Sequence, residues 1–393
     1  MSDIEHVLLN GSIAEIGALY RSRRITVVEA IAWYLARIER FKDLNAVREV
    51  SEHALEDAKR ADHELAQGVD HGPLHGIPVL LKDNILARGL RASAGARAFA
   101  DFKPNRDATL VAKLRAAGCI VLGKTNMTEF ADYVSEVMPS EFSGAGGVVK
   151  NPHGIRYDRG QGSSVGSAAA VAASLAPFAI GSETQNSIQT PASYSSSVGY
   201  KPSTGLVSRA GVVPLVASQD SPGPLTRCVA DAALVTAILA GADPHDGLTL
   251  IYTQSTLPDP SRVFDLAGVR IGAPRRQVAA RADFADVMPL FEAAPRSSQH
   301  RAPPSSIRAT CRRRSNCKRR ARAYSAPSSR PPSTHSWKTT TRPAAWARLR
   351  TSSPGTSSTR TPFRSDNRCC SPHKPPAVCP IRRTDPIAHA TLR

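Results

Sequence analysis

The stretch GQGSSVGSAAAVAASLAPFAIGSETQNSIQTP, residues 160–191, decides the fold. It begins with a loop of glycine and serine and continues as a run of small apolar residues, which indicates a buried helix. A short apolar segment, residues 177–180, then predicts a strand, and Ser187 lies just before what we expect to be another helix start. A helix followed directly by a strand is the alternation of an α/β sheet.

The same alternation continues on both sides of this stretch. Apolar runs predict strands at residues 77–81, 119–122 and 269–272. Apolar residues at helical spacing predict helices at residues 108–116, 226–240 and 283–294, and we expect Pro295 to end the last of them. We therefore expect an α/β domain.

The amino-terminal part is predicted to be helical. Ser12 with Glu15, and Thr26 with Glu29, have the spacing of capping boxes, in which a hydroxyl accepts from a free backbone N–H while the glutamate reaches back. A third helix is expected at residues 52–65.

Charge is distributed unevenly along the chain. The 393 residues contain 51 Lys and Arg against 33 Asp and Glu, a net charge of +18. Residues 295–393 hold 22 of the basic residues and only two acidic ones, whereas residues 1–294 carry a net charge of −2. The last 99 residues have only seven Leu, Ile, Val, Phe or Met, far below the roughly 20% needed for a core. We expect a folded domain at residues 1–294 and a disordered, low-complexity basic tail at 295–393.

Two hypotheses account for this tail. We favour a frameshifted segment of a GC-rich gene, which leaves the domain incomplete at its C-terminus, because Arg, Ser and Pro rise abruptly while glycine nearly disappears. The alternative is a nucleic-acid-binding tail, since residues 312–314 and 318–320 are basic runs that suit phosphates. The Cys and His residues of the tail lack the paired spacing of metal ligands.

The sequence also bears on the cellular compartment. It contains no run of about 18 apolar residues and no secretory leader, and only Cys119 and Cys228 lie in residues 1–294. We expect a cytoplasmic protein with no membrane partner.

Three segments carry residues suited to acyl transfer. They are GIPVLLKDN (76–84), which places Lys82 where a strand ends, the glycine and serine loop at 160–167, and IGSETQNSIQTP (180–191) with Ser187. Serine needs a base to take its proton, and a buried, neutral lysine can be that base. Backbone N–H groups from Thr184 to Ser187 are candidates to stabilise the oxyanion. This set predicts an amide or ester hydrolase.

Together with VGYKPSTGLVSRAGVVPLVASQDSPGPLTRCVADAA (198–233), these segments resemble the amidase signature family from about residue 10 to residue 294. The resemblance implies a mixed β-sheet covered by helices and a Ser-cisSer-Lys triad. Its lysine corresponds to Lys82, its relay serine, preceded by a cis peptide bond, to Ser163, and its nucleophile to Ser187. Thr184, Gln185 and Asn186 correspond to the oxyanion and substrate-binding loop.

The sequence departs from the family pattern near Ser187. Gln185 and Asn186 replace the usual glycine pair, Gln189 replaces the usual arginine, and Val165 replaces a glycine. If the loop needs a positive φ at 185 or 186, Asn186 tolerates it best. We interpret these changes as a subfamily with altered substrate contacts, less similar to the A subunit of glutamyl-tRNA amidotransferase, which keeps the glycine pair.

Simpler interpretations exist for each residue. Taken alone, Lys82 is a solvated lysine, Ser187 a helix N-cap, Cys119 a core residue and Asp220 a turn cap rather than a supporting acceptor in the site. The loop at 160–167 lacks the Gly-Lys-Ser/Thr ending of a phosphate-binding loop.

Taken together, the residues favour an amidase. It is expected to hydrolyse a small-molecule, non-peptide carboxamide to an acid and ammonia or an amine through an acyl-enzyme, with no metal and no organic cofactor. The alternatives are an inactive remnant of such an enzyme, the amidotransferase A subunit and the basic-tail nucleic-acid binder. No pattern in the sequence indicates an oligomeric state.

Overall fold

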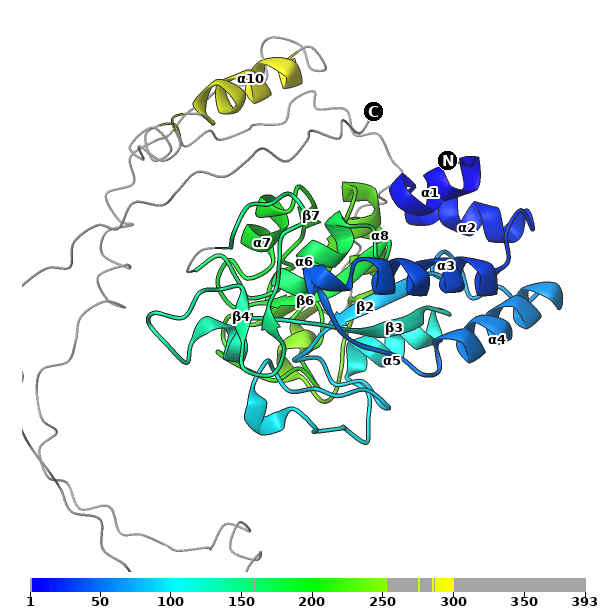
Figure 1. The fold of residues 1–393 in the computed structure, drawn as a ribbon, viewed down its shortest axis with the longest axis horizontal. Helices are drawn as coiled ribbons and strands as arrows, with labels where there is room; N and C mark the ends of the chain where they lie inside the picture. The colour runs from blue at the N-terminus through cyan, green and yellow to red at the C-terminus, as the bar shows by residue number, and fades with distance from the viewer. Residues whose placement is uncertain (1, 158–159, 253–274, 276–284, 286, 300–393) are drawn as a thin grey trace, which may run out of the picture. The chain divides into compact units, whose positions relative to one another are not determined.

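The computed structural model describes residues 2–157, 160–252, 275, 285 and 287–299 (Figure 1). The strand expected at residues 269–272 and the basic tail from residue 300 onward lie outside these residues.

Three capped helices open the chain: α1 (Asp3–Asn10), α2 (Ile13–Arg21) and α3 (Val27–Arg40). Both predicted capping boxes are confirmed, with Ser12 accepting from the N–H of Glu15 at α2 and Thr26 accepting from the N–H of Glu29 at α3. The prediction omitted an equivalent box that starts α1, formed by Ser2 and Glu5. The helix α4 (Ala54–Ala66) packs beside α3, as Figure 1 shows.

A six-stranded mixed sheet lies at the centre of the fold. Its strands are ordered β1 (Val47–Val50), β3 (Ile120–Thr125), β2 (Pro78–Lys82), β6 (Phe178–Glu183), β8 (Ser221–Thr226) and β7 (Val198–Gly199). The strands β3, β2 and β6 run parallel, and β1 and β8 flank them antiparallel. Every residue of β2 and β3 is buried, as expected for strands covered on both faces. The predicted α/β fold, a mixed sheet covered by helices, is confirmed.

The remaining elements connect and cover these strands. The helices are α5 (Thr109–Ala116), α6 (Val165–Ala172), α7 (Gln189–Tyr194), α8 (Val229–Leu239) and α10 (Met288–Gln299). The short elements are η1 (Lys42–Leu44), η2 (Arg97–Phe99), η3 (Glu129–Asp132), η4 (Gly247–Tyr252) and the β4 (Phe142–Ser143) and β5 (Gly147–Val148) hairpin.

The helix α6 lies very close to the backbone of other segments at Gly166. A Cβ at Gly166 would lie 2.3 Å from the carbonyl oxygen of Asn126 and 2.6 Å from that of Ala46, so only glycine fits there. This close packing fixes the start of α6, where the serine loop enters the helix.

The strand β8 is absent from the prediction, because its sequence, SPGPLT, contains two prolines and a glycine that normally mark a turn. Its register with β6 nevertheless continues from the pair Glu183–Ser221 to the pair Phe178–Thr226. On its other side β7 pairs with Leu225 and Thr226, and Tyr200 donates its N–H to the carbonyl oxygen of Pro224 at 3.0 Å, so Pro222 lies beyond the paired part of this edge.

The last helix extends beyond its predicted end. We expected Pro295 to end a helix at residue 294, but α10 runs from Met288 to Gln299. That prediction is wrong, because an internal proline removes one intrahelical hydrogen bond and bends a helix without necessarily ending it.

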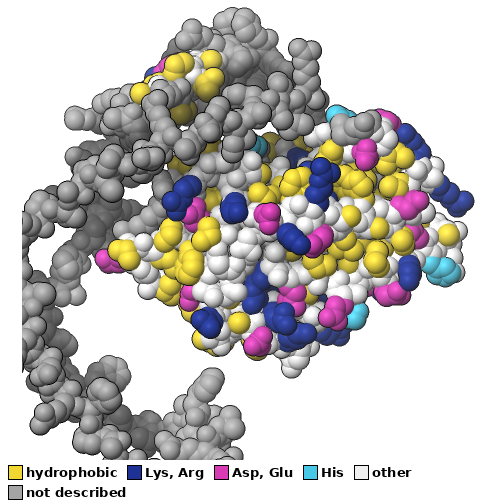
Figure 2. All heavy atoms as spheres, in the orientation of Figure 1, with side chains coloured by type: hydrophobic (Ala, Val, Ile, Leu, Met, Phe, Trp, Pro, Cys, Tyr) yellow, Lys and Arg dark blue, Asp and Glu magenta, His cyan; other side chains and the backbone are white. Residues whose placement is uncertain are grey.

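Acidic and basic side chains are interspersed on the face of the folded part that Figure 2 shows. This mixture agrees with the nearly balanced charge of residues 1–294.

Candidate functional site

Two neighbouring parallel strands carry the predicted site to one edge of the sheet. Lys82 is the last residue of β2, and β6, which pairs with β2, leads directly into the loop that holds Ser187. Ser163 lies in the loop before α6, and its neighbour Ser164 donates its backbone N–H to the carbonyl oxygen of Ser187 at 3.0 Å. The topology therefore brings the three predicted segments together.

Lys82 makes the contact expected of a base that acts through a relay serine. Its Nζ donates to the Oγ of Ser163 at 2.7 Å and to the carbonyl oxygen of Ser182 at 2.9 Å. The side chains of Lys82 and Ser163 are fully buried. Both ends of the contact are thus fixed and removed from water.

Burial also sets the charge of this lysine. Loss of hydration lowers the pKa of Lys82 to about 7, although the nearby carboxylates of Glu183 and Asp220 act in the opposite direction. Half of the Lys82 side chains are therefore neutral near physiological pH, as a base requires.

The serine loop distinguishes its two adjacent hydroxyls. The peptide bond between Gly162 and Ser163 is cis, as the resemblance implied. Ser163 contacts Lys82, whereas the Oγ of Ser164 donates to the carbonyl oxygen of Ser182 at 3.2 Å. The geometry therefore favours Ser163 over Ser164 as the partner of the lysine.

Ser187 borders a cavity and is 6% exposed. Its Oγ donates to the carbonyl oxygen of Gln185 at 3.2 Å. Among the described residues, no hydrogen bond joins the hydroxyls of Ser163 and Ser187. The first contact of the proposed relay is formed, and the second requires Ser187 to turn away from Gln185.

The loop before Ser187 contains a residue with left-handed backbone conformation. Asn186 has φ 49°, which matches the expectation that it takes a left-handed conformation, and its Nδ2 donates to the carbonyl oxygen of Gly160 at 2.8 Å. Thr184 Oγ1 donates to Asp220 at 2.5 Å, and the exposed Gln185 side chain accepts from Tyr133 at 3.2 Å. Within the described part of the chain, the backbone N–H groups of residues 185–187 make no hydrogen bond, so they are available to a ligand.

Two acidic residues shape this loop. Glu183, which the sequence analysis did not single out, accepts from the backbone N–H groups of Ile188 at 2.7 Å and Gln189 at 2.9 Å, at the start of α7. Asp220 accepts from the backbone N–H of Val216 at 3.0 Å as well as from Thr184, so it is both a turn cap and a support of the site. The only sequence signal for Glu183 is an acid just before an expected helix start.

A cavity of about 300 Å³ adjoins Ser187. Most of its described lining is apolar, and these residues are Ala94, Met127, Phe130, Ala131, Ala210, Val212, Val213, Pro214, Leu215, Ala217 and Pro222. The size suits a small organic molecule.

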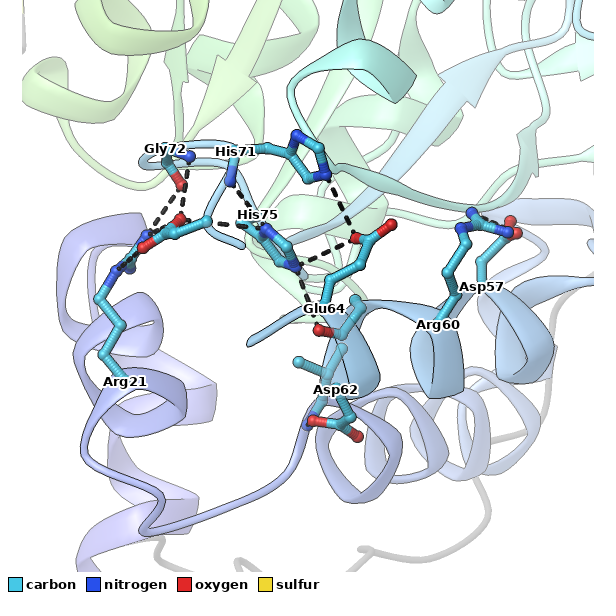
Figure 3. Close-up of polar contacts among 11 residues, drawn as sticks. Arg21, Asp57, Arg60, Asp62, Glu64, His71, Gly72 and His75 are labelled. Carbon is cyan, nitrogen blue, oxygen red and sulfur yellow. Dashed lines mark hydrogen bonds and ion pairs between the residues drawn. The ribbon is translucent and has the colours of Figure 1, made fainter. Parts of the chain in front are cut away.

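Figure 3 shows the group of described residues that comes nearest to a metal site, Glu64, His71 and His75, whose ligand atoms lie within 4.8 Å of one another. The Nδ1 of His75 accepts from the backbone N–H of His71 at 2.9 Å, so the neutral ring carries its proton on Nε2, 3.2 Å from the carbonyl oxygen of Ala61. A metal-bound histidine has the opposite arrangement, with its remaining N–H pointing to an acceptor. The group therefore ties α4 to the loop that follows it.

The chain is similar to proteins of one family. A model of the Amidase family matches residues 29–295. The A subunit of glutamyl-tRNA(Gln) amidotransferase from Alkaliphilus metalliredigens is 40% identical over 268 residues, which cover 67% of this chain and 53% of the relative. The same subunit from Burkholderia thailandensis is 42% identical over 273 residues, 67% of this chain and 54% of the relative. The chain thus spans about half the length of these relatives.

The fold of the chain is also similar to that of a solved structure. The peptide amidase from Stenotrophomonas maltophilia superposes with a TM-score of 0.69 and 39% identity, covering 76% of this chain and 61% of that one. The chain therefore belongs to the amidase family.

Proposed function

We propose that this protein is an amidase that hydrolyses a small carboxamide to a carboxylic acid and ammonia or an amine, with Ser187 as nucleophile, Ser163 as relay and Lys82 as base. The observation that carries the proposal is the 2.7 Å contact between the Nζ of Lys82 and the Oγ of Ser163. A lysine with a pKa near 7, joined to a serine whose neighbour Ser164 contacts a second serine that borders a cavity, supports this assignment.

In the first half-reaction, Ser187 Oγ attacks the carbonyl carbon of the amide. Its proton passes to Ser163, and the proton of Ser163 passes to the neutral Nζ of Lys82. The backbone N–H groups of residues 185–187 stabilise the oxyanion. Collapse of this intermediate breaks the C–N bond, and the proton returns through Ser163 to the leaving nitrogen.

In the second half-reaction, water attacks the acyl-enzyme. Lys82, neutral again, takes the proton of the water through Ser163, and the same N–H groups stabilise the second oxyanion. Collapse releases the acid and returns a proton to Ser187. Every proton moves between groups of the chain, so the scheme uses no metal or organic cofactor.

The proposal includes a folded domain at residues 1–294 and a cytoplasmic location. The family match, which ends at residue 295, supports the boundary. The two free cysteines, Cys119 and Cys228, support the location. Among the described residues, no helix combines the length and the apolar character needed to cross a membrane.

The test uses the whole chain. Purified protein is treated with a fluorophosphonate probe and assayed against a panel of carboxamides, in parallel with its Ser187→Ala variant. We expect labelling and ammonia release from the natural chain and neither from the variant. A folded chain that takes no label and releases no ammonia is instead an inactive relative of such an enzyme, which would overturn the proposal.

A second candidate is a subunit of a glutamyl-tRNA(Gln) amidotransferase. It is favoured by the 40–42% identity to the A subunits. Gln185, Asn186 and Gln189 count against it, since the resemblance expects a glycine pair and an arginine there. Ammonia release from glutamine in clear preference to other amides supports this candidate.

A further inference from the structure

We propose that the acyl part of the substrate is an uncharged, apolar group that packs against the segment Val212–Leu215. This inference rests on the proposed function and names the class of amide that the site takes. It follows from two properties of the cavity beside Ser187: its charged side chains are already engaged within the protein, and its apolar wall is anchored to the loop that follows Lys82.

The charged groups of the lining are occupied by protein partners. Arg209 and Asp246 form a two-pronged ion pair, with Nε to Oδ2 at 2.8 Å and Nη2 to Oδ1 at 2.5 Å. Glu183 accepts from the start of α7, and Asp220 accepts from Thr184, Leu215 and Val216. A charged substrate group that paired with one of these Arg, Asp or Glu side chains would have to break one of these contacts, which is costly.

The sign of the lining charge also disfavours an anionic acyl group. Arg209 and Asp246 cancel each other, which leaves the carboxylates of Glu183 and Asp220 beside the site. A substrate carboxylate would be repelled by both. A substrate ammonium would be attracted by their field but would find their oxygens already filled by N–H and O–H donors.

The apolar wall is held close to the catalytic groups. Val213 donates its backbone N–H to the carbonyl oxygen of Asn84 at 2.9 Å, and Val212 forms a bridge with Ile85. Asn84 and Ile85 lie two and three residues after Lys82 in the chain. Leu215 is fixed at the other end of the wall by its N–H contact with Asp220 at 2.8 Å. An acyl chain attached to Ser187 in this cavity therefore meets a preformed apolar surface.

The test measures binding, so that it does not depend on turnover. The Ser187→Ala variant is titrated with hexanamide, with 5-aminopentanamide, which replaces the terminal methyl by an ammonium, and with glutaramate, which ends in a carboxylate. We expect hexanamide to bind at least about ten-fold tighter than either charged amide. From butanamide to hexanamide, affinity should rise about four-fold per added methylene.

Substitutions in the segment Val212–Leu215 test whether the tighter binding of hexanamide arises there. Val213→Thr and Leu215→Asn, which keep the shape of the side chain, should each weaken hexanamide binding several-fold in the Ser187→Ala background. Ile155→Asn is the control, because Ile155 is 52% exposed and is not part of the cavity lining. Should Leu215→Asn fail to fold, Val213→Thr, the smaller change, still decides the result.

The outcomes separate the two proposals. Equal or tighter binding of a charged amide, unchanged binding in both wall variants, or no binding of any amide overturns the inference. If the natural chain hydrolyses amides through Ser187 but prefers charged ones, the inference fails while the proposed function stands. If hexanamide binds in the expected order and no amide is hydrolysed, the proposed function fails and the binding preference stands.

Discussion

The side-chain nitrogen of Lys82 lies 2.7 Å from the hydroxyl of Ser163, although 81 positions separate the two residues in the chain. A second contact, to the carbonyl oxygen of Ser182, uses another donor of the same nitrogen. The nitrogen is thereby held between the loop of Ser163 and β6. In the proposed mechanism, only its neutral form can accept the proton of Ser163.

Amide hydrolysis should require the neutral form of Lys82. Because burial lowers its pKa to about 7, kcat/KM for an uncharged amide should be constant above about pH 8 and fall about ten-fold per pH unit below about pH 6. A pH–rate profile checks this, since an uncharged substrate does not titrate. A profile that stays flat down to pH 5 would contradict the role of Lys82.

Lys82 should also make stability depend on pH. Its pKa is about 7 in the folded chain and 10.5 when unperturbed, so between these values the unfolded chain binds more protons and the free energy of unfolding falls as pH decreases, by about 1.4 kcal/mol per unit. Below about pH 7 the contribution becomes flat. Lys82→Met should remove this contribution and make the free energy of unfolding constant between about pH 7 and 8, as denaturant unfolding at several pH values can measure.

Lys124 provides the control for that measurement. It is also fully buried, and burial lowers its pKa to about 8. Above about pH 8 both lysines contribute, so Lys124→Met should halve the slope there while leaving the change between pH 7 and 8 intact. If the free energy of unfolding became constant over pH 7–8 in both variants, the two lysines would not titrate separately.

The two adjacent serines should differ sharply in their effect on activity. Ser163→Ala removes the hydroxyl that contacts Lys82, and we expect kcat to fall 10²- to 10⁴-fold, the usual contribution of a proton-transfer group. Ser164→Ala removes contacts with the backbone carbonyl oxygen and N–H of Ser182 and none with Lys82, so its main effect should be on stability, by about 1 kcal/mol. Steady-state kinetics and thermal melting of both variants test the assignment, and equal losses of kcat would argue against it.

The sequence predicted those features that depend on local chemistry. Capping boxes such as Thr26 with Glu29 identify helix starts because both partners lie within one turn, and Lys82 at a strand end follows from an apolar run that stops. The strand β8 could not be predicted, since Pro222 and Pro224 normally mark a turn. A strand tolerates them here because its regular pairing with β6 lies on one side, while β7 pairs with only part of the other side. Glu183 accepts from the N–H of Ile188 only because the loop between them folds back toward the end of β6. The sequence spacing of the two residues does not predict that path.

The left-handed backbone at Asn186 should matter for catalysis. Asn186→Gly keeps this conformation accessible and should retain activity within a few-fold, whereas Asn186→Val should lose about 1–2 kcal/mol of stability and at least ten-fold in kcat. Ser196, with φ 50° outside the cavity lining, is the matched control. Ser196→Val should cost similar stability with little change in kcat, and a similar loss of kcat in both valine variants would assign the effect to folding alone.

Glu183 should act on both the helix and the lysine. Glu183→Ala leaves the N–H groups of Ile188 and Gln189 without their acceptor, which should cost about 1–2 kcal/mol in the free energy of unfolding. Because the carboxylate of Glu183 raises the pKa of Lys82, its loss should also move the midpoint of the pH–rate profile below pH 7.

Glu183→Gln keeps an oxygen acceptor but not the charge, so it should preserve more stability than Glu183→Ala and shift the midpoint equally. The exposed Glu136, which is not among the carboxylates that raise the pKa of Lys82, is the control for loss of a negative charge, and Glu136→Ala should change neither quantity. A midpoint that stays at pH 7 in both Glu183 variants would mean that this carboxylate stabilises α7 without influencing the base.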